Sequence, residues 1–164
     1  MNKKERRKIL NLLEKNSRLT PDEIAIMLGL EAEVVRAEIA QMESENIICG
    51  YHTIIRWDSI KEDAVTAMVE LRVTPQGGEG YAKIAAQISE YPQVESLYLM
   101  SGAYDFLVML KGNNLKEISM FISEKLASIE EVQSTTTHFT LTKYKELGVQ
   151  METIKTDGRM VVSP

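Results

Sequence analysis

Apolar residues in the first third of the chain recur every three or four positions, the spacing that places side chains on one face of an α-helix. Such stripes lie at residues 9–13, 24–28 and 35–42. The second stripe begins with Thr20, Pro21 and Glu23, a capping box with proline at the first helical position. It ends at Gly29, because glycine readily takes the positive φ of a helix C-terminus. The pattern predicts three short helices within residues 4–48.

The last two of these helices, with a short glycine-containing turn between them, have helix-turn-helix spacing. In that motif the last helix enters the major groove of DNA. The spacing alone fits a small three-helix bundle that never meets DNA equally well, so both interpretations stand at this point. If the motif does bind DNA, the N-terminal part is a three-helix DNA-binding domain of the winged or plain helix-turn-helix type.

The pattern changes in the second part of the chain. β-branched and aromatic residues predict a strand over residues 47–57. Residues 65–73 alternate apolar and polar side chains with a period of two, which also predicts a strand. The following elements are a helix, two short strands, a helix opened by a capping box of Asn114 and Glu117, and a final strand. They are expected at residues 81–88, 94–100, 106–110, 115–126 and 132–144.

The element order β-α-β-β-α-β is that of the ferredoxin-like split βαβ fold, so we predict the α+β fold class. The expected parts are a helix-turn-helix domain at residues 1–48, a linking strand segment at 49–62, a βαββαβ domain at 63–146 and a C-terminal tail at 147–164. Within the tail, residues 160–162 predict a terminal strand, and a disordered tail is the alternative.

The middle strands of the predicted sheet are apolar on both faces. Leu97 and Leu99 fall on one side, and Val94, Tyr98 and Met100 fall on the other. Strands of this kind are normally buried on both faces, but the two helices of the fold cover only one. This predicts a homodimer in which the uncovered faces meet. The alternative is that the chain's own tail covers that face.

Composition narrows the function classes. The net charge of −5 gives no overall basic field, so any contact with DNA must be local. No run reaches the 18 or more apolar residues of a membrane span, and we expect a cytoplasmic protein. Cys49 is the only cysteine, which excludes an internal disulfide. His52 and His138 are the only histidines and no catalytic motif accompanies them, so we expect no enzyme, no cofactor and no metal site.

The predicted third helix is acidic, with five glutamates and one arginine over residues 31–45. At about 100° per residue, Glu31, Glu38 and Glu45 share one flank, where basic residues of the first helix can pair with them. The face opposite the apolar stripe is nearly neutral. Candidate DNA contacts are the N-terminal cations, which can reach phosphates, and polar residues at that face. They are Lys3, Lys4, Arg6, Arg7, Arg36, Gln41 and Ser44.

Two motifs stand in the second half of the chain: SGAYDF at residues 101–106 and VQSTTT at residues 132–137. Together with a helix-turn-helix joined to a βαββαβ domain, they resemble the Lrp/AsnC (feast/famine) transcriptional regulators over residues 4–146. The resemblance implies a sequence-specific DNA-binding regulator that responds to an amino acid or a related metabolite. It also implies homodimers that often associate into octamers, with the effector bound between dimers by the C-terminal domain.

The resemblance also places an effector site. The matching positions are Gly102, Tyr104, Asp105, Thr135 and Thr137. At position 103 this chain has alanine, where many members of the family have a polar residue. Asp105 suits an ammonium group, whereas hydroxyls and turn N–H groups suit a carboxylate. Without the family context, the simpler interpretation is an aspartate that closes a hairpin and ordinary strand threonines.

A second function is consistent with the same sequence. The family often has a basic residue where this chain has Glu38, so direct affinity for DNA is expected to be weak at the third helix. The alternative hypothesis is an amino-acid sensor or interaction module whose DNA binding is weakened or lost. A steep fall of DNA affinity with salt, caused by counterion release, separates the two hypotheses.

Overall fold

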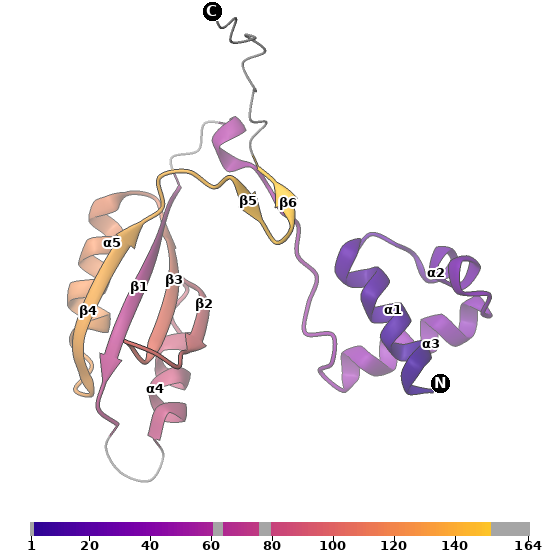
Figure 1. The fold of residues 1–164 in the computed structure, drawn as a ribbon, viewed down its shortest axis with the longest axis horizontal. Coiled ribbons are helices and arrows are strands. Elements are labelled where there is room, and N and C mark those ends of the chain that lie inside the picture. The colour runs from indigo at the N-terminus through magenta and orange to yellow at the C-terminus, as the bar shows by residue number, and fades with distance from the viewer. Residues whose placement is uncertain (1, 61–63, 76–79, 152–164) are drawn as a thin grey trace, which may run out of the picture. The chain divides into compact units, whose positions relative to one another are not determined.

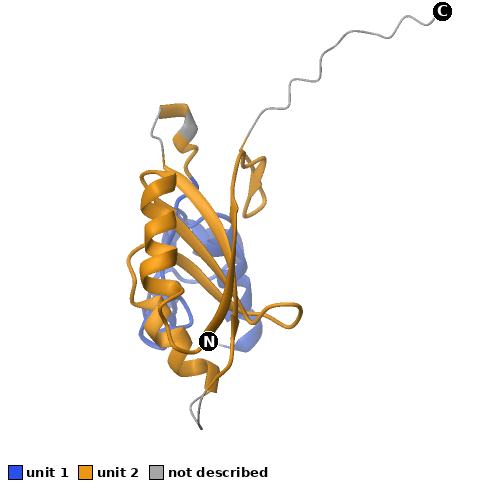
Figure 2. Cartoon of the chain, turned by 90° about the vertical axis from the view of Figure 1, so that its left-hand side faces the viewer, with its two compact units in different colours: residues 1–54 blue, residues 55–164 orange. Residues whose placement is uncertain are grey.

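The computed structural model describes residues 2–60, 64–75 and 80–151, and it divides between residues 54 and 55 into two compact units (Figures 1 and 2). The terminal strand predicted at residues 160–162 lies outside the described residues. Among the helices of the described part, none has the length and apolarity needed to cross a lipid bilayer.

The N-terminal unit contains the three predicted helices. They are α1 (Lys3–Lys15), α2 (Pro21–Leu28) and α3 (Ala32–Ser44). The capping box of α2 is confirmed, because the Thr20 backbone N–H donates to the Glu23 carboxylate at 2.8 Å and the Glu23 N–H donates to the Thr20 hydroxyl at 3.2 Å. Hydrogen bonds from the Thr20 backbone and hydroxyl hold the pKa of Glu23 below its usual value. Gly29 ends α2 with φ 66° and ψ 41°.

Each helix contributes fully buried side chains to one small core. Ile9 of α1, Ile24 of α2 and Met42 of α3 are all 0% exposed. The α2 and α3 helices therefore hold a fixed relation across the turn at Gly29, which is what a helix-turn-helix needs in order to present one helix outward.

The prediction of a strand over residues 47–57 is wrong. Residues 49–56 form no regular element, and Trp57–Ile60 form a short 3-10 turn, η1. β-branched side chains favour extended backbone, but a strand also needs a neighbour for its N–H and C=O groups. Within the described chain none pairs with this segment. Tyr51 instead donates its hydroxyl to Glu43 at 2.7 Å, and burial together with this hydrogen bond raises the pKa of Tyr51 to about 12.

The second unit has the predicted βαββαβ order. Its elements are β1 (Val65–Val73), α4 (Gly80–Ser89), β2 (Val94–Leu99), β3 (Phe106–Gly112), α5 (Leu115–Phe121), a π-helical turn η2 (Ile122–Leu126) and β4 (Val132–Phe139). The antiparallel sheet has the order β2-β3-β1-β4. Both helices lie on one side of it (Figure 2). The predicted α+β fold is confirmed.

The two sheet faces differ in burial. On the face that the helices cover, the side chains of Val69 and Leu71 of β1 and Val108 of β3 are 0% exposed. We call the opposite surface the helix-free face. From the strand register it carries Met68, Glu70, Arg72, Tyr98, Leu107, Met109, Thr136 and His138. Met68 and Tyr98 are 38% and 50% exposed, so apolar surface stays uncovered within the described part of one chain.

One strand departs from strict alternation. Val94 pairs with Leu110 and Ser96 pairs with Met109, with a register shift between them. This irregularity rotates the start of β2, so Val94 packs into the core rather than on the side of Tyr98, where we had predicted it.

The capping box predicted for α5 forms only in part. Asn114 accepts the Glu117 N–H at 2.9 Å, as expected. The Glu117 carboxylate, however, accepts the backbone N–H of Asn113 at 2.9 Å instead of that of Asn114.

A small hairpin follows the sheet. The strand predicted to reach residue 144 ends at Phe139, and β5 (Lys145–Glu146) then pairs with β6 (Val149–Gln150) as a separate sheet.

Candidate functional site

Arg6 joins the first and third helices. Its guanidinium contacts the carboxylate of Glu38 through Nε and that of Glu45 through Nη1 at 2.8 Å. Glu38 is only 5% exposed. Burial acts to raise the pKa of Glu38, but opposing hydrogen bonds and charges, Arg6 among them, leave this pKa below its usual value. The pairing of the α3 flank with the first helix, expected from the helical positions, is therefore observed for Glu38 and Glu45. Arg6 serves first to hold α3 in place.

The predicted DNA contacts on α3 are exposed and bonded within the unit. Arg36 pairs with Glu33 and, at 3.1 Å, with Asp22; Gln41 donates to Glu45 at 2.7 Å; Ser44 donates to the Gln41 carbonyl at 2.8 Å. Exposed pairs of this kind contribute little to stability and exchange readily. These side chains can therefore turn to another acceptor, but they must give up an existing one.

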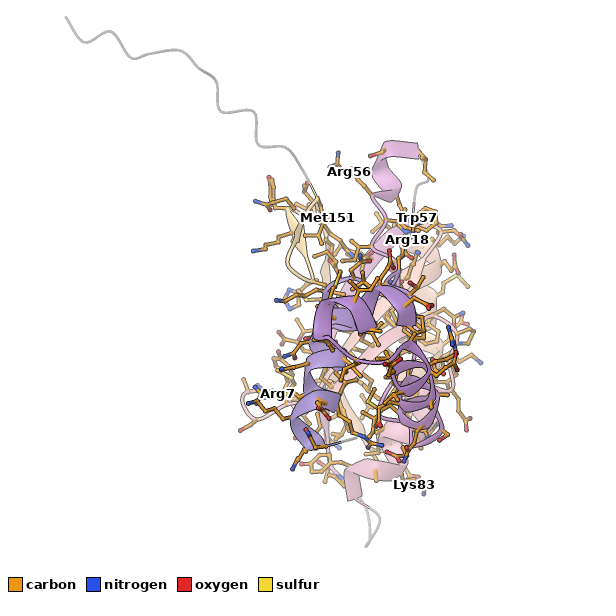
Figure 3. All side chains as sticks on the ribbon, turned by 90° about the vertical axis from the view of Figure 1, so that its right-hand side faces the viewer. Arg7, Arg18, Arg56, Trp57, Lys83 and Met151 are labelled. Atoms are coloured by element: carbon orange, nitrogen blue, oxygen red, sulfur yellow. The ribbon has the colours of Figure 1, made fainter. Side chains whose placement is uncertain are left out.

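The start of α1 carries cationic side chains that make fewer ion pairs than Arg36 of α3. Asn2 caps the helix, and Lys3, Lys4 and Arg7 are exposed. Among residues 2–60, no ion pair involves these three side chains. Figure 3 shows Arg7 pointing outward from α1. Positive charge available to a phosphate is thus concentrated at the first turns of α1.

The second group of predicted residues gathers where β1 ends and β3 begins. The Asp105 carboxylate accepts the Val73 backbone N–H at 2.9 Å and the Tyr81 hydroxyl at 3.2 Å. Its backbone N–H donates to the Leu71 carbonyl at 2.9 Å, and its carbonyl accepts the Met100 N–H at 2.7 Å. Asp105 is therefore fixed in orientation. This arrangement also satisfies the simpler interpretation, an aspartate that closes a hairpin.

The threonines lie on the neighbouring strand. Thr135 stands opposite Leu71 and Thr137 stands opposite Val69, so both project to the helix-covered face and both are half-buried. Because Leu71 also bonds to Asp105, the structure brings Asp105 and Thr135 to the same end of the sheet. Thr137 lies two residues further along β4. Gly102 and Tyr104, exposed and half-buried respectively, lie in the loop that leads to Asp105.

Sequence reasoning missed Tyr81 as part of this group. The sequence predicted Tyr81 only as the first residue of a helix at residues 81–88, but its ring packs edge-on against Phe106, with centroids 5.9 Å apart, and its hydroxyl donates to Asp105. The hydrogen bond to that carboxylate raises the pKa of Tyr81. The two residues are 24 positions apart in the sequence, so no local sequence pattern predicts their contact.

A shallow groove lies at the other end of β3. It has a volume of about 400 Å³ and is lined in part by Pro92, Glu95 and Lys111. The Lys111 ammonium is 3.8 Å from the Glu95 carboxylate and 4.8 Å from the Trp57 ring centroid. None of the predicted effector residues lines it. The described residues also contain no cluster of histidine, cysteine and carboxylate side chains suited to a metal ion.

Family comparisons match both units. A model of the Lrp/AsnC ligand binding domain matches residues 66–150, and a model of winged helix-turn-helix DNA-binding domains matches residues 6–48. The chain belongs to the Lrp/AsnC family. As an Lrp/AsnC transcriptional regulator, it combines a DNA-binding helix-turn-helix with a domain that binds a small-molecule effector.

Individual relatives agree with this assignment. The HTH-type transcriptional regulator YugG of Bacillus subtilis is 42% identical over 157 residues, which cover 95% of each chain. An AsnC family transcriptional regulator from Agrobacterium tumefaciens has a similar structure, with a TM-score of 0.68 and 25% identity over 89% of this chain and 94% of that one. The transcriptional regulator of Neisseria meningitidis solved as an L-Met complex shares the fold, with a TM-score of 0.68 and 23% identity over 89% and 93% of the chains.

The matched ranges contain both groups of residues described above. Arg6, Glu38 and the outer face of α3 lie in the helix-turn-helix match, and Asp105 and Thr135 lie in the ligand-domain match. In this Lrp/AsnC chain, Glu38 of the acidic third helix is buried and paired with Arg6, whereas the other four glutamates of residues 31–45 are exposed to solvent.

Proposed function

We propose that this Lrp/AsnC regulator binds an amino acid at the end of the sheet that carries Asp105 and Thr135. The observation that carries the proposal is that both residues flank Leu71 of β1: the Asp105 N–H donates to the Leu71 carbonyl on one side, and Thr135 of β4 pairs with Leu71 on the other. An α-amino acid is a zwitterion: its ammonium group suits Asp105, and its carboxylate suits Thr135, Thr137 and the N–H groups of the loop at Gly102. The L-Met complex of the Neisseria relative supports this ligand class.

A thermal-shift screen of the twenty amino acids tests the ligand proposal. A ligand at about a hundred times its dissociation constant stabilises the native state by about 2.7 kcal/mol, so hits are readily visible. Asp105→Asn keeps the shape and one acceptor oxygen of the side chain, but it removes the negative charge and replaces the second acceptor by an NH2 donor. We expect it to abolish the shift, and Thr135→Val to reduce it. Glu95→Gln, a change of an exposed residue at the start of β2, away from Asp105 and Thr135, serves as the control and should leave the shift intact.

A shift that Asp105→Asn leaves unaltered would move the ligand away from this end of the sheet. If none of the twenty amino acids gives a shift with the wild-type protein, the effector belongs to another chemical class. The two results are distinguishable, because only in the first does an amino acid stabilise the wild-type protein.

For DNA, we propose that Lys3, Lys4 and Arg7 contact phosphates while Arg36, Gln41 and Ser44 approach the bases or backbone. Arg6 holds α3 in place and contributes a smaller direct contact. Fluorescence anisotropy with the chain's own upstream DNA tests this, because each lost phosphate contact lowers the slope of log affinity against log salt by about one. Lys4→Ala should weaken binding similarly for all sequences. Lys15→Ala, at the other end of α1, is the matched control. From this proposed DNA binding we expect the protein to act in the cytoplasm.

The helix-free face is the proposed surface for self-association. Met68 and Tyr98 are exposed there, with Leu107 and Met109 beside them in the register. Sheets that carry apolar side chains on both faces are normally covered on both, and a second copy offers a matching surface. The homodimer is the smallest assembly that covers it. Octamers of such dimers are the form that the family resemblance leads us to expect.

One observation favours a second function. Besides the tied polar side chains of α3, the α2 helix exposes Ile26 by 83% and Met27 by 57%, which suits contact with a protein better than contact with DNA. This would make the chain an amino-acid sensor or interaction module. Absence of any DNA binding at low salt, with and without amino acids, would favour this function over the first.

A further inference from the structure

The turn of the β5–β6 hairpin has an unusual residue at its tip. Leu147 has φ 43° and Gly148 has φ 85°. Positive φ at both central residues is the property of a type I′ turn, for which Asn-Gly is the favoured pair. A bulky apolar residue seldom adopts positive φ. Leu147 is also 79% exposed, so neither the local backbone nor the surrounding water favours leucine at this position.

The hairpin has too little structure to bury its own apolar residues. Each strand has only two residues, and isolated two-stranded hairpins are marginally stable in water. Its base is held: Met151 is buried, and its N–H donates to the Tyr144 carbonyl at 2.9 Å. Apart from the half-buried Lys143 and Glu146, the other residues of 141–150 are exposed to solvent. The exposed apolar residues are Leu141 at 96%, Leu147 at 79%, Tyr144 at 59% and Val149 at 49%.

The hairpin stands on a particular side of the sheet. It follows β4 and projects past the end of the sheet, away from α4 and α5 (Figures 1 and 2). That is the side of the helix-free face, where Met68 and Tyr98 are exposed. Two uncovered apolar surfaces of one domain therefore point in the same direction. Because the hairpin lies past the end of its own sheet, it is placed to reach a neighbour rather than to cover the face from which it projects.

We propose that the segment 141–150 is an arm that clasps a second copy of this chain, with Leu147 as its apolar anchor on the ligand domain of that copy. The inference rests on the proposed self-association through the helix-free face and adds a contact outside that face. A twofold axis makes such a contact reciprocal, so each dimer contains two arms and two anchors. A leucine kept in an unfavoured backbone conformation is consistent with a side chain that is buried in the assembly.

Leu147→Asn tests the arm without weakening its turn. Asparagine is the favoured residue before glycine in a type I′ turn, so the hairpin should form at least as well as in the wild type. If the leucine is an anchor, sedimentation equilibrium should show the dissociation constant of self-association rising by about tenfold or more, because burial of two leucine side chains is lost. Leu115→Asn, a 54% exposed leucine on α5, is the matched control and should leave association unchanged.

Hydrogen exchange of the residue 141–150 amides completes the test. Retained or increased protection in Leu147→Asn, together with weakened association, supports the anchor. Association equal to the wild type overturns the arm while leaving the helix-free face intact as the proposed dimer surface. A wild-type protein that stays monomeric at all concentrations overturns both the arm and the proposed self-association.

Discussion

Replacing Glu38 by glutamine should lower the stability of the N-terminal unit and raise its affinity for DNA. Glu38 is buried at the boundary of α1 and α3 and pairs with Arg6, whose side chain is 24% exposed. The substitution preserves the shape of the side chain and one acceptor oxygen, but it removes the charge and replaces the other acceptor by an NH2 donor. Arg6 keeps its second partner, Glu45, at 2.8 Å. The N-terminal unit should therefore become less stable without losing its structure.

The size of the loss follows from this partial burial. Breaking a fully buried ion pair by neutralising one partner costs about 3–5 kcal/mol. Here the arginine reaches water and retains another carboxylate, so we expect about 1–2 kcal/mol for Glu38→Gln. Glu31→Gln is the control, because Glu31 is exposed on the same flank of α3 and makes no side-chain cap hydrogen bond. It changes the net charge equally and should leave stability unchanged.

The pH dependence has a defined sign. The folded-state pKa of Glu38 is below the unfolded value near 4.5, so the unfolded chain binds the proton more tightly. The stabilisation is therefore complete above about pH 5 and is lost as the pH falls through the folded-state pKa. Wild type and Glu38→Gln should differ most near neutral pH, and the difference should shrink in acid. Glu31→Gln, measured at the same pH values, is the charge-matched control.

Native-state hydrogen exchange of the α1 and α3 amides measures this loss in the intact chain. In parallel, DNA anisotropy should show tighter binding by Glu38→Gln than by Glu31→Gln, because the same charge change additionally loosens the hold on Arg6. Unchanged opening free energies in Glu38→Gln would refute the structural role of the pair. Equal DNA affinities of the two variants would refute the release of Arg6.

Three further substitutions probe other parts of the chain. Thr20→Ala removes the N-cap of α2 and should lower the stability of that helix by about 1 kcal/mol, as measured by exchange of its amides. Gly112→Ala places a Cβ 2.9 Å from Cγ1 of Ile118, so urea unfolding should show a loss of about 1–3 kcal/mol. Tyr98→Lys puts a charge on the helix-free face and should shift sedimentation toward monomer; an unshifted profile would remove this face from the interface.

Local chemistry accounts for the elements that sequence reasoning placed well. The cap at Thr20, the stop at Gly29 and the period of two in β1 each act within a few residues, so they are visible in one sequence. The errors have the opposite origin. The prediction of a linking strand failed because a strand forms only where a partner segment pairs with it. Val94 was assigned to the wrong sheet face because the bulge that moves it depends on the register of β2 with β3.

The candidate site was predictable to a similar degree. The family motif pointed to Asp105 and Thr135, and they lie at the same end of the sheet because β1 pairs with both β3 and β4, as the predicted topology implies. Tyr81 was missed because its contact with Asp105 depends on where α4 packs over the sheet. The same limit applies to Arg6. The helical positions predicted that the glutamate flank of α3 would pair with a basic residue of the first helix, but they did not predict which one.

Charge distribution links the two proposed activities. With a net charge of −5 and a single cluster of exposed cations at the start of α1, the N-terminal unit of one copy offers few phosphate contacts. Joining two copies makes the second contact intramolecular and raises the overall affinity without any new residue on α3. In the proposed function, the effector site and the self-association surfaces belong to the same domain. An amino acid that alters association would therefore alter DNA binding through the number of linked helix-turn-helix units, and a variant that stays monomeric should bind DNA weakly and without response to the amino acid.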